Sequence, residues 1–161
     1  MSLRILICGG TFDKEYDELS GKLFFRNSHV SEMLKLGRSK LKVKLEKVFM
    51  IDSLDMTASH RKQLLKKCIN CKEDRIVITH GTDTMVESAK VIGLARLNKT
   101  IVFTGAMVPY KFGSSDGLFN LGASLAFAQT LKPGVYVAMN GRYFRYDHVL
   151  KDKSKGVFKS I

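Results

Sequence analysis

Apolar residues, many of them β-branched, gather in short runs along this chain. Four runs, at residues 3–8, 75–79, 100–104 and 134–139, are mainly apolar at both alternating positions, which is typical of strands buried on both faces of a parallel sheet. Residues 42–51 first alternate between polar and apolar side chains and then become wholly apolar. This pattern predicts a fifth strand with one solvent-facing side near its start.

The segments between these runs have apolar residues at helical spacing. Val30, Met33 and Leu34 predict a helix over residues 28–36, with Ser28 as its N-cap. Residues 9–22 show neither pattern and are predicted to form a loop. The remaining elements that we expect are helices over 58–69, 84–97 and 118–131, and short strands or a hairpin within 142–161.

Strands and helices alternate along the chain, without an internal repeat or a linker rich in proline and glycine. Such alternation implies βαβ units and a mostly parallel sheet. We therefore expect a single α/β domain over residues 1–161, with three layers, helices on both faces of the sheet and a flavodoxin-like or Rossmann-like topology. A chain of 161 residues buries roughly 70% of its unfolded surface, which is enough for a proper core.

The composition adds a surplus of positive charge. The 27 Lys and Arg residues against 15 Asp and Glu residues give a net charge of +12, which attracts anions, acidic substrates or nucleic acid. The densest basic strip consists of Lys35, Arg38, Lys40, Lys42, Lys44 and Lys47. We interpret it as a solvated helix end and strand face, because it lacks the interleaved aromatic residues on which single-stranded bases stack. Nucleic acid is therefore not an expected partner.

The three cysteines suit neither a disulfide scaffold nor a zinc site. Cys68 and Cys71 form a lone Cys-x-x-Cys pair, whereas structural zinc needs four ligands. Cys8 ends an apolar run and is expected to be a small buried residue. Residues 1–10 hold too short an apolar run for a signal peptide, and no segment approaches the roughly 20 apolar residues of a membrane span. We expect a cytoplasmic protein without a metal ion or a membrane contact.

Two short strings that follow predicted strands carry the candidate chemistry. Residues 8–13 read Cys-Gly-Gly-Thr-Phe-Asp, and residues 80–85 read His-Gly-Thr-Asp-Thr-Met. Glycines at the end of a strand let the backbone approach a ligand closely, and open α/β sheets bind ligands at the carboxyl ends of their strands. Thr11 is a candidate nucleophile that needs a base. Thr82 and Asp83 open a predicted helix, where backbone N–H groups can face an anion.

Each part of these strings also has a purely structural interpretation. Thr11 and Asp13 can shape a turn, and Thr82 or Asp83 can cap a helix. Taken singly, the residues favour these structural roles. Because both strings lie at the carboxyl ends of parallel strands, together they favour a site.

A competing nucleophile is Ser115, in the Gly-x-Ser-x-Gly string at residues 113–117. A nucleophile elbow requires a strand directly before it, and a predicted loop stands there instead. We therefore favour a loop that buries Asp116 under the site. The chain has neither a Walker A loop nor a Gly-x-Gly-x-x-Gly string, so the sequence does not support a nucleotide cofactor.

The strings together resemble the L-asparaginase family of the threonine-nucleophile, bacterial type. That family shows Thr-Gly-Gly-Thr-Ile, Ser-x-Asp-Met, His-Gly-Thr-Asp-Thr-Met, Gly-Ala-Met, Ser-x-Asp-Gly-x-Phe-Asn-Leu and a late lysine. This chain has, in the same order, Gly9-Gly10-Thr11, Ser53-Leu54-Asp55-Met56, His80 to Met85, Gly105-Ala106-Met107 and Ser114 to Leu121. Cys8 and Phe12 depart from the first of these strings, and both departures suggest packing changes beside the site. The resemblance implies that residues 1–161 form the family's N-terminal catalytic domain without its C-terminal domain.

The resemblance also implies roles for individual residues. Thr11 is similar to the primary nucleophile, and Tyr16 to the tyrosine that orients its hydroxyl. Thr82, Asp83 and Lys151 look like a second catalytic triad, for which Lys153 and Lys155 are alternatives to Lys151. Substrate contacts are implied for Gly10, Ser53, Leu54, Asp83 and Ala106, with Ser53 on the α-carboxylate and Asp83 on the α-amino group.

The implied reaction is hydrolysis of the side-chain amide of asparagine to aspartate and ammonia, through a threonine acyl-enzyme and without a cofactor. The resemblance further implies a homodimer or homotetramer. One alternative is an amidase component that acts with tRNA, which the charge of +12 motivates. The other is a non-catalytic module that binds aspartate or asparagine, although the complete set of candidate catalytic residues argues against it.

Overall fold

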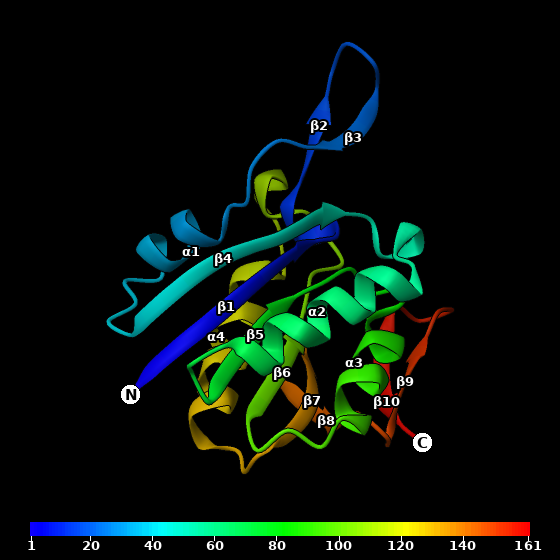
Figure 1. The fold of residues 1–161 in the computed structure, drawn as a ribbon. Coiled ribbons are helices and arrows are strands. Elements are labelled where there is room, and N and C mark those ends of the chain that lie inside the picture. Colours follow the sequence, from blue (N-terminus) through cyan, green and yellow to red (C-terminus); the bar gives the residue numbers. More distant parts are fainter.

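The computed structural model describes all 161 residues and is built around a six-stranded sheet (Figure 1). The strands lie in the order β4-β1-β5-β6-β7-β8. Neighbours run parallel from β4 to β7, and β8 is antiparallel to β7. The strands are β1 (Ser2–Gly9), β4 (Lys42–Ile51), β5 (Arg75–Thr79), β6 (Thr100–Thr104), β7 (Gly134–Met139) and β8 (Arg142–Arg145). The mostly parallel sheet is therefore confirmed.

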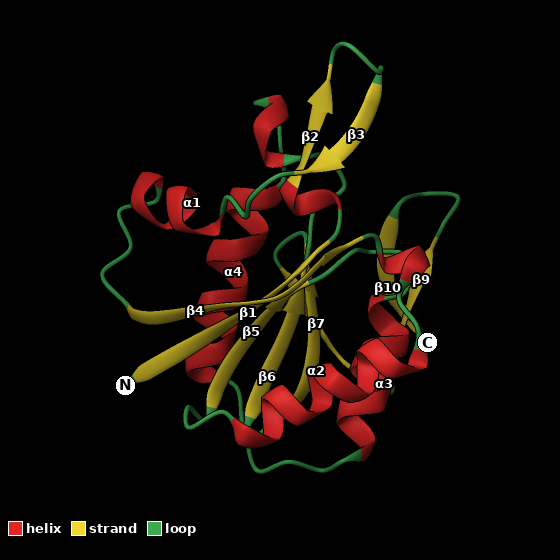
Figure 2. Ribbon diagram, turned by 45° about the horizontal axis from the view of Figure 1, so that its top comes forward, coloured by secondary structure: helices red, strands yellow, loops and turns green.

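Helices cover both faces of this sheet (Figure 2). α2 (Ala58–Asn70) and α3 (Met85–Leu94) lie on one face, and α1 (Val30–Leu36) and α4 (Gly117–Thr130) lie on the other. Alternate strand residues feed two separate cores: Ile76 and Ile78 of β5 join the α2–α3 cluster, whereas Val77 joins the α1–α4 cluster. This alternation explains why the central strands are apolar at every position, and it confirms the three-layer α/β architecture.

Two antiparallel hairpins stand outside the main sheet. β9 (Val149–Asp152) and β10 (Val157–Ser160) form the hairpin expected near the end of the chain. β2 (Lys14–Asp17) and β3 (Lys22–Phe25) form a hairpin that projects from the sheet edge (Figure 1). β2 lies within the predicted loop over residues 9–22, and the sequence predicted no element for residues 23–27. Its strands read Lys-Glu-Tyr-Asp and Lys-Leu-Phe-Phe. Neither alternates between apolar and polar residues, so the sequence shows no strand period here.

Two helix ends differ from the sequence prediction. The N-cap position of α1 is His29 rather than Ser28. Ser28 instead donates to Asp13 Oδ1 at 3.2 Å and accepts from the Val30 amide at 3.3 Å. α3 ends at Leu94 rather than at residue 97, because Arg96 has a left-handed φ of 50° that cannot continue a helix.

The sheet places the candidate strings at a topological switch point. The chain leaves β1 toward α1 and leaves β5 toward α3, and these helices lie on opposite faces. Adjacent parallel strands whose connections diverge in this way open a crevice at their carboxyl ends. Thr11 follows β1 and His80 follows β5, so both strings lie at the edge of the sheet where such a crevice is expected.

The packing of α2 gives a direct test of the fold. Leu64 is fully buried in the α2–α3 cluster, whereas Ile69 of the same helix is 50% exposed. We expect Leu64→Ala to lower the free energy of unfolding by about 3 kcal/mol, because it leaves a cavity. Ile69→Ala should cost less than about 1 kcal/mol. Urea unfolding of both variants measures the difference, and equal losses would contradict the placement of this helix.

Candidate functional site

Lys151 joins the string that follows β5. Its Nζ donates to Thr82 Oγ1 and to Asp83 Oδ1, both at 2.8 Å. The Lys151 side chain is only 9% exposed, and Thr82 is buried. Residues that lie 68 and 69 positions apart in the chain are thus brought into one polar cluster. The alternatives Lys153 and Lys155 are exposed in the turn after β9 and form no contact with this cluster.

The β9–β10 hairpin presents Lys151 because its inner face is anchored in the core. Val149 precedes Lys151 by two residues, and Phe158 lies opposite Lys151 across the hairpin. The three side chains therefore share one face. Val149 and Phe158 are both buried in the α2–α3 cluster. Their burial fixes the hairpin and directs the lysine stem inward.

The arrangement around Thr82 suits proton transfer. Its hydroxyl accepts from Lys151 and directs its own hydrogen toward Met107 Sδ at 3.7 Å, which is a weak acceptor. A neutral Lys151 amine would instead accept the hydroxyl proton across the same 2.8 Å contact. Asp83 contacts the amine through Oδ1 alone, and its side chain is 40% exposed. This carboxylate can therefore bind a second cationic group from the solvent side.

Thr11 reaches the same region through the backbone of Gly10. Gly10 has a φ of 75°, and a Cβ built on it would lie 2.3 Å from the Gly81 nitrogen. The two loops therefore touch backbone to backbone, one residue before Thr11 and one residue before Thr82. Thr11 is half-buried at the start of a 3₁₀ turn. The structure shows no hydrogen bond between its hydroxyl and Thr82, Asp83 or Lys151.

Ser53 packs against the other side of Gly81. It follows β4 and is 1% exposed. A Cβ on Gly81 would lie 2.6 Å from the Ser53 side chain. The Thr84 amide donates to Ser53 Oγ at 3.3 Å, and the Thr84 hydroxyl donates to the Ser53 carbonyl oxygen at 2.8 Å. Leu54 beside it is 67% exposed, so it forms an outer wall rather than part of the core.

Tyr16 is the predicted site residue that the structure does not bring to the others. It lies in β2, opposite Leu23 of β3, and is 55% exposed. Its hydroxyl is 3.9 Å from the position of a Cβ on Gly21 and therefore points toward the tip of the hairpin. The base of this hairpin is tied to the Ser53 segment by an ion pair between Lys14 and Asp52. The role expected of Tyr16 remains a prediction.

Asp116 supports the loop that carries Ala106. Its carboxylate accepts from the amides of Met107 and Val108 at 3.0 Å. Asn120 Nδ2 donates both to Asp116 Oδ2 at 3.0 Å and to the Gly105 carbonyl oxygen at 2.9 Å. Sequence reasoning missed Asn120, although it belongs to the same string as Asp116. Ala106, which is 1% exposed, is consequently held in a fixed loop at the end of β6.

Ser115 is engaged in the same loop and does not form a nucleophile elbow. Its hydroxyl donates to the Val108 carbonyl oxygen at 2.6 Å and accepts from the Gly117 amide at 2.9 Å. A 3₁₀ turn over Tyr110–Phe112 precedes it, rather than the strand that an elbow needs. Residues 113–117 thus form a loop rather than an elbow, but Asp116 is half-buried and not buried as the sequence predicted.

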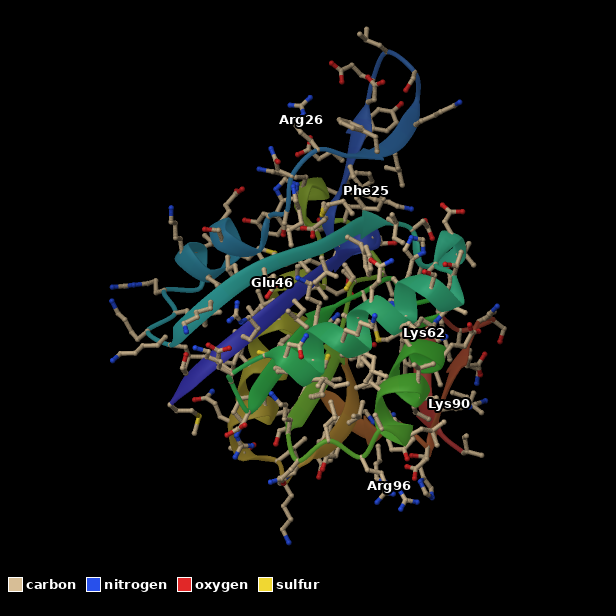
Figure 3. All side chains as sticks on the ribbon, in the orientation of Figure 1. Phe25, Arg26, Glu46, Lys62, Lys90 and Arg96 are labelled. Atoms are coloured by element: carbon tan, nitrogen blue, oxygen red, sulfur yellow. The ribbon has the colours of Figure 1, made fainter.

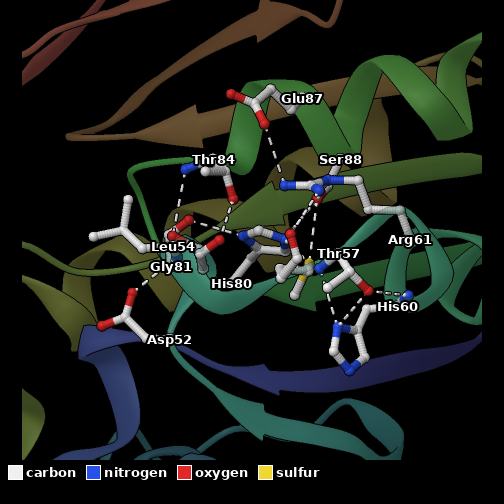
Figure 4. A network of polar contacts seen from close by, with 12 residues as sticks. Asp52, Leu54, Thr57, His60, Arg61, His80, Gly81, Thr84, Glu87 and Ser88 are labelled. Atoms are coloured by element: carbon white, nitrogen blue, oxygen red, sulfur yellow. Dashed lines mark hydrogen bonds and ion pairs between the residues drawn. The ribbon is translucent and has the colours of Figure 1, made fainter.

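His80 lies in a buried network that sequence reasoning also missed (Figure 4). Its Nδ1 is 2.8 Å from the Gly81 carbonyl oxygen, and its Nε2 is 2.8 Å from Ser88 Oγ. Arg61 Nε donates to Ser88 Oγ at 3.1 Å. Burial, together with a smaller effect of the nearby Arg61 charge, lowers the pKa of His80 to about 4. The imidazole is therefore neutral near pH 7.

Positive charges spread over several faces of the molecule. Arg26 follows the β2–β3 hairpin, Lys62 projects from α2 and Arg96 follows α3 (Figure 3). All six residues of the basic strip are exposed, at the end of α1, in the loop after it and on the edge strand β4. Cys8, Cys68 and Cys71 are free thiols. No helix has both the length and the apolar character needed to cross a bilayer.

The contact between Gly10 and Gly81 predicts that a single added methyl group at Gly10 destabilises the protein. Gly10→Ala would place its Cβ 2.3 Å from backbone nitrogen, so the two loops must separate. We expect Gly10→Ala to lower the free energy of unfolding by at least about 2 kcal/mol. Gly113→Ala is the matched control, because Gly113 has a similar φ of 85° and nothing within 4 Å. Similar losses in both variants, measured by urea unfolding, would show that the clash is not real.

The neutral state of His80 predicts a pH dependence of stability. The unfolded chain takes up a proton near pH 6.5, whereas the folded state resists until about pH 4. The stability from this group is therefore complete above pH 6.5 and is lost as the pH falls from 6.5 to 4. Between pH 7 and pH 4.5, wild type should lose about 2 kcal/mol more than His80→Asn. Urea unfolding at the two pH values measures this loss of stability. If wild type and His80→Asn lost the same amount, the imidazole would not be neutral and buried.

Comparison with known proteins identifies the family of the chain. The chain matches the family model described as Asparaginase, N-terminal, over residues 2–160. It is 39% identical over 127 residues to L-asparaginase 2 of Escherichia coli, a match that covers 74% of this chain and 36% of that protein. It is 29% identical over 168 residues to L-asparaginase of Thermococcus kodakarensis, which covers 100% of this chain and 51% of that protein.

Solved structures show the same likeness. The thermostable L-asparaginase from Thermococcus kodakarensis has a TM-score of 0.89 at 27% identity, over 100% of this chain and 51% of that one. The probable cytoplasmic L-asparaginase from Campylobacter jejuni has a TM-score of 0.81 at 29% identity, over 99% of this chain and 51% of that one. This chain thus spans about half the length of these two proteins. With the family model matched across nearly its whole length, the chain belongs to the asparaginase family.

Proposed function

We propose that this chain hydrolyses the side-chain amide of L-asparagine to aspartate and ammonia. The observation that carries the proposal is the pair of 2.8 Å contacts from Lys151 to Thr82 and Asp83. They lie next to the backbone junction that brings Thr11 to the same crevice. A hydroxyl, an amine and a carboxylate grouped beside a second hydroxyl are the groups that acyl transfer requires.

The reaction that we propose has two acyl-transfer steps. The Thr11 oxygen adds to the amide carbon, its proton passes to the leaving nitrogen, and the C–N bond breaks to release ammonia. A water molecule then adds to the resulting ester carbon and restores the Thr11 hydroxyl as aspartate leaves. The Lys151–Thr82 pair relays the protons in both steps, because the amine and hydroxyl already share a hydrogen bond.

The substrate contacts that we propose follow from which polar groups remain free. Asp83 Oδ2 forms no contact with Lys151 and can accept from the α-ammonium group of asparagine. Ser53 accepts from the Thr84 amide but keeps its hydroxyl hydrogen, which can be donated to the α-carboxylate. Gly10, Leu54 and Ala106 then line the space between these ends. Tyr16 can orient the Thr11 hydroxyl only if the β2–β3 hairpin moves, since its own hydroxyl now points toward Gly21.

We also propose that residues 1–161 act as a catalytic domain within a homodimer or homotetramer. Asp83 and Leu54 are both open to solvent, so a neighbouring subunit can cover them and exclude water from the reaction. The compartment that we propose is the cytoplasm, in keeping with three free thiols. The tRNA-linked alternative receives less support, because the exposed positive charges are spread over several faces.

Ammonia release from L-asparagine tests the proposed activity. We expect Thr11→Ala and Lys151→Met each to lower kcat by at least roughly a thousandfold, as losses of nucleophiles and their activating partners do. Lys153→Met is the matched control and should keep the wild-type rate, because Lys153 is exposed in the adjacent turn. Wild-type protein that binds asparagine in calorimetry without releasing ammonia would refute the proposal and favour a binding module.

A further inference from the structure

The network behind the site has a fixed direction (Figure 4). At one end, the Arg61 guanidinium can only donate, and its Nε donates to Ser88 Oγ at 3.1 Å. At the other end, the Gly81 carbonyl oxygen can only accept, and it lies 2.8 Å from His80 Nδ1. Between these ends, Ser88 Oγ lies 2.8 Å from His80 Nε2. Because the Ser88 oxygen can accept from two donors, the Gly81 end decides where the hydrogens of His80 lie.

This arrangement selects one tautomer of His80. Because Nδ1 faces a carbonyl oxygen, Nδ1 carries the hydrogen. A neutral imidazole has a single N–H group, so Nε2 is an acceptor and the Ser88 hydroxyl donates to it. The other two neighbours of the ring are uncharged: Met56 Sδ lies 3.1 Å from Nε2, and Phe103 packs edge-on against the ring.

Arg61 is itself held in place, and its positive charge is paired with a carboxylate. Its Nη1 donates to the Met56 carbonyl oxygen at 2.8 Å, and its Nη2 donates to Glu87 Oε2 at 3.2 Å. α2 and α3 therefore both contribute to the orientation of Ser88. The network joins the two helices on one face of the sheet to the loop that follows β5.

The Gly81 carbonyl oxygen matters because it belongs to the peptide that joins Gly81 to Thr82. That peptide is planar and trans, so fixing its oxygen fixes the whole unit. Gly81 has no side chain that could restrict rotation, and Gly10 and Ser53 pack against it from two sides. Turning this peptide would move the Thr82 hydroxyl relative to Lys151.

We propose that His80 is a positioning residue, which holds the Gly81–Thr82 peptide through its Nδ1–H group and so keeps the Thr82 hydroxyl against Lys151. The Gly81 carbonyl oxygen selects this tautomer, and Ser88, which Arg61 orients, favours it by donating to Nε2. The kinetic consequence rests on the proposed function, whereas the tautomer and the contact do not.

Two substitutions of His80 separate positioning from mere filling of space. In His80→Asn, the side-chain NH₂ group takes the place of Nδ1 and can still donate to Gly81. In His80→Gln, the amide reaches toward Ser88, in the place of Nε2, and leaves Gly81 without a donor. We expect His80→Asn to keep kcat within about tenfold of wild type and His80→Gln to lower kcat by roughly a hundredfold, with KM for asparagine little changed. His148→Gln is the control, because His148 is exposed.

The result that would overturn the proposal is a kcat of His80→Gln equal to or above that of His80→Asn. The proposal would also be overturned if the decrease in kcat of each variant matched the decrease in its melting temperature rather than the loss of the donor to Gly81. The melting temperature of each variant is therefore measured alongside kcat.

Nitrogen-15 NMR of wild-type protein with labelled histidine gives a readout that needs no activity and no variant. At pH 7, His80 should be neutral with its hydrogen on Nδ1, and Ser88→Ala should shift the population toward the Nε2–H tautomer. A wild-type His80 with its hydrogen on Nε2 would refute the proposal. If wild type released no ammonia, the proposed function would fail, and this spectrum would still decide whether the contact to Gly81 exists.

Discussion

The site depends on a contact between two stretches of backbone. Gly10 and Gly81 approach so closely that neither has room for a side chain: a Cβ on the first would meet the second at 2.3 Å, and a Cβ on the second would meet Ser53 at 2.6 Å. Three loops from three neighbouring strands therefore converge on one residue. This convergence brings Thr11, Ser53 and Thr82 to one place. Only the Ser53 hydroxyl also links two of the loops, because its oxygen accepts from the Thr84 amide.

The other requirement is a scaffold that keeps these loops still. Residues that present no group to the crevice supply it: Asp116 and Asn120 fix the loop after β6, and the His80 network fixes the loop after β5. Both devices end on backbone amides or carbonyls rather than on the candidate catalytic side chains. Preorganisation of this kind leaves the reactive groups free to bind and transfer protons.

The sequence predicts the sheet more fully than the site. Residues 75–79, 100–104 and 134–139 form strands with the predicted boundaries, because strands buried on both faces are apolar at every position. The β2–β3 hairpin escaped prediction because its strands are only four residues long and do not alternate between apolar and polar positions. Lys151 was placed by resemblance alone, and no local pattern signals its contact with Thr82. The link from Ser88 to His80 was missed because it arises only when α3 packs over the end of β5.

The position of Lys151 couples the core to the polar cluster. The amine shares one face of a hairpin with Val149 and Phe158, which pack into the core on the α2–α3 side. The same pair of strands therefore buries apolar groups and holds the amine against Thr82. A substitution that loosens this hairpin from the core would displace the amine as well, so the stability of this face and the geometry of the cluster change together.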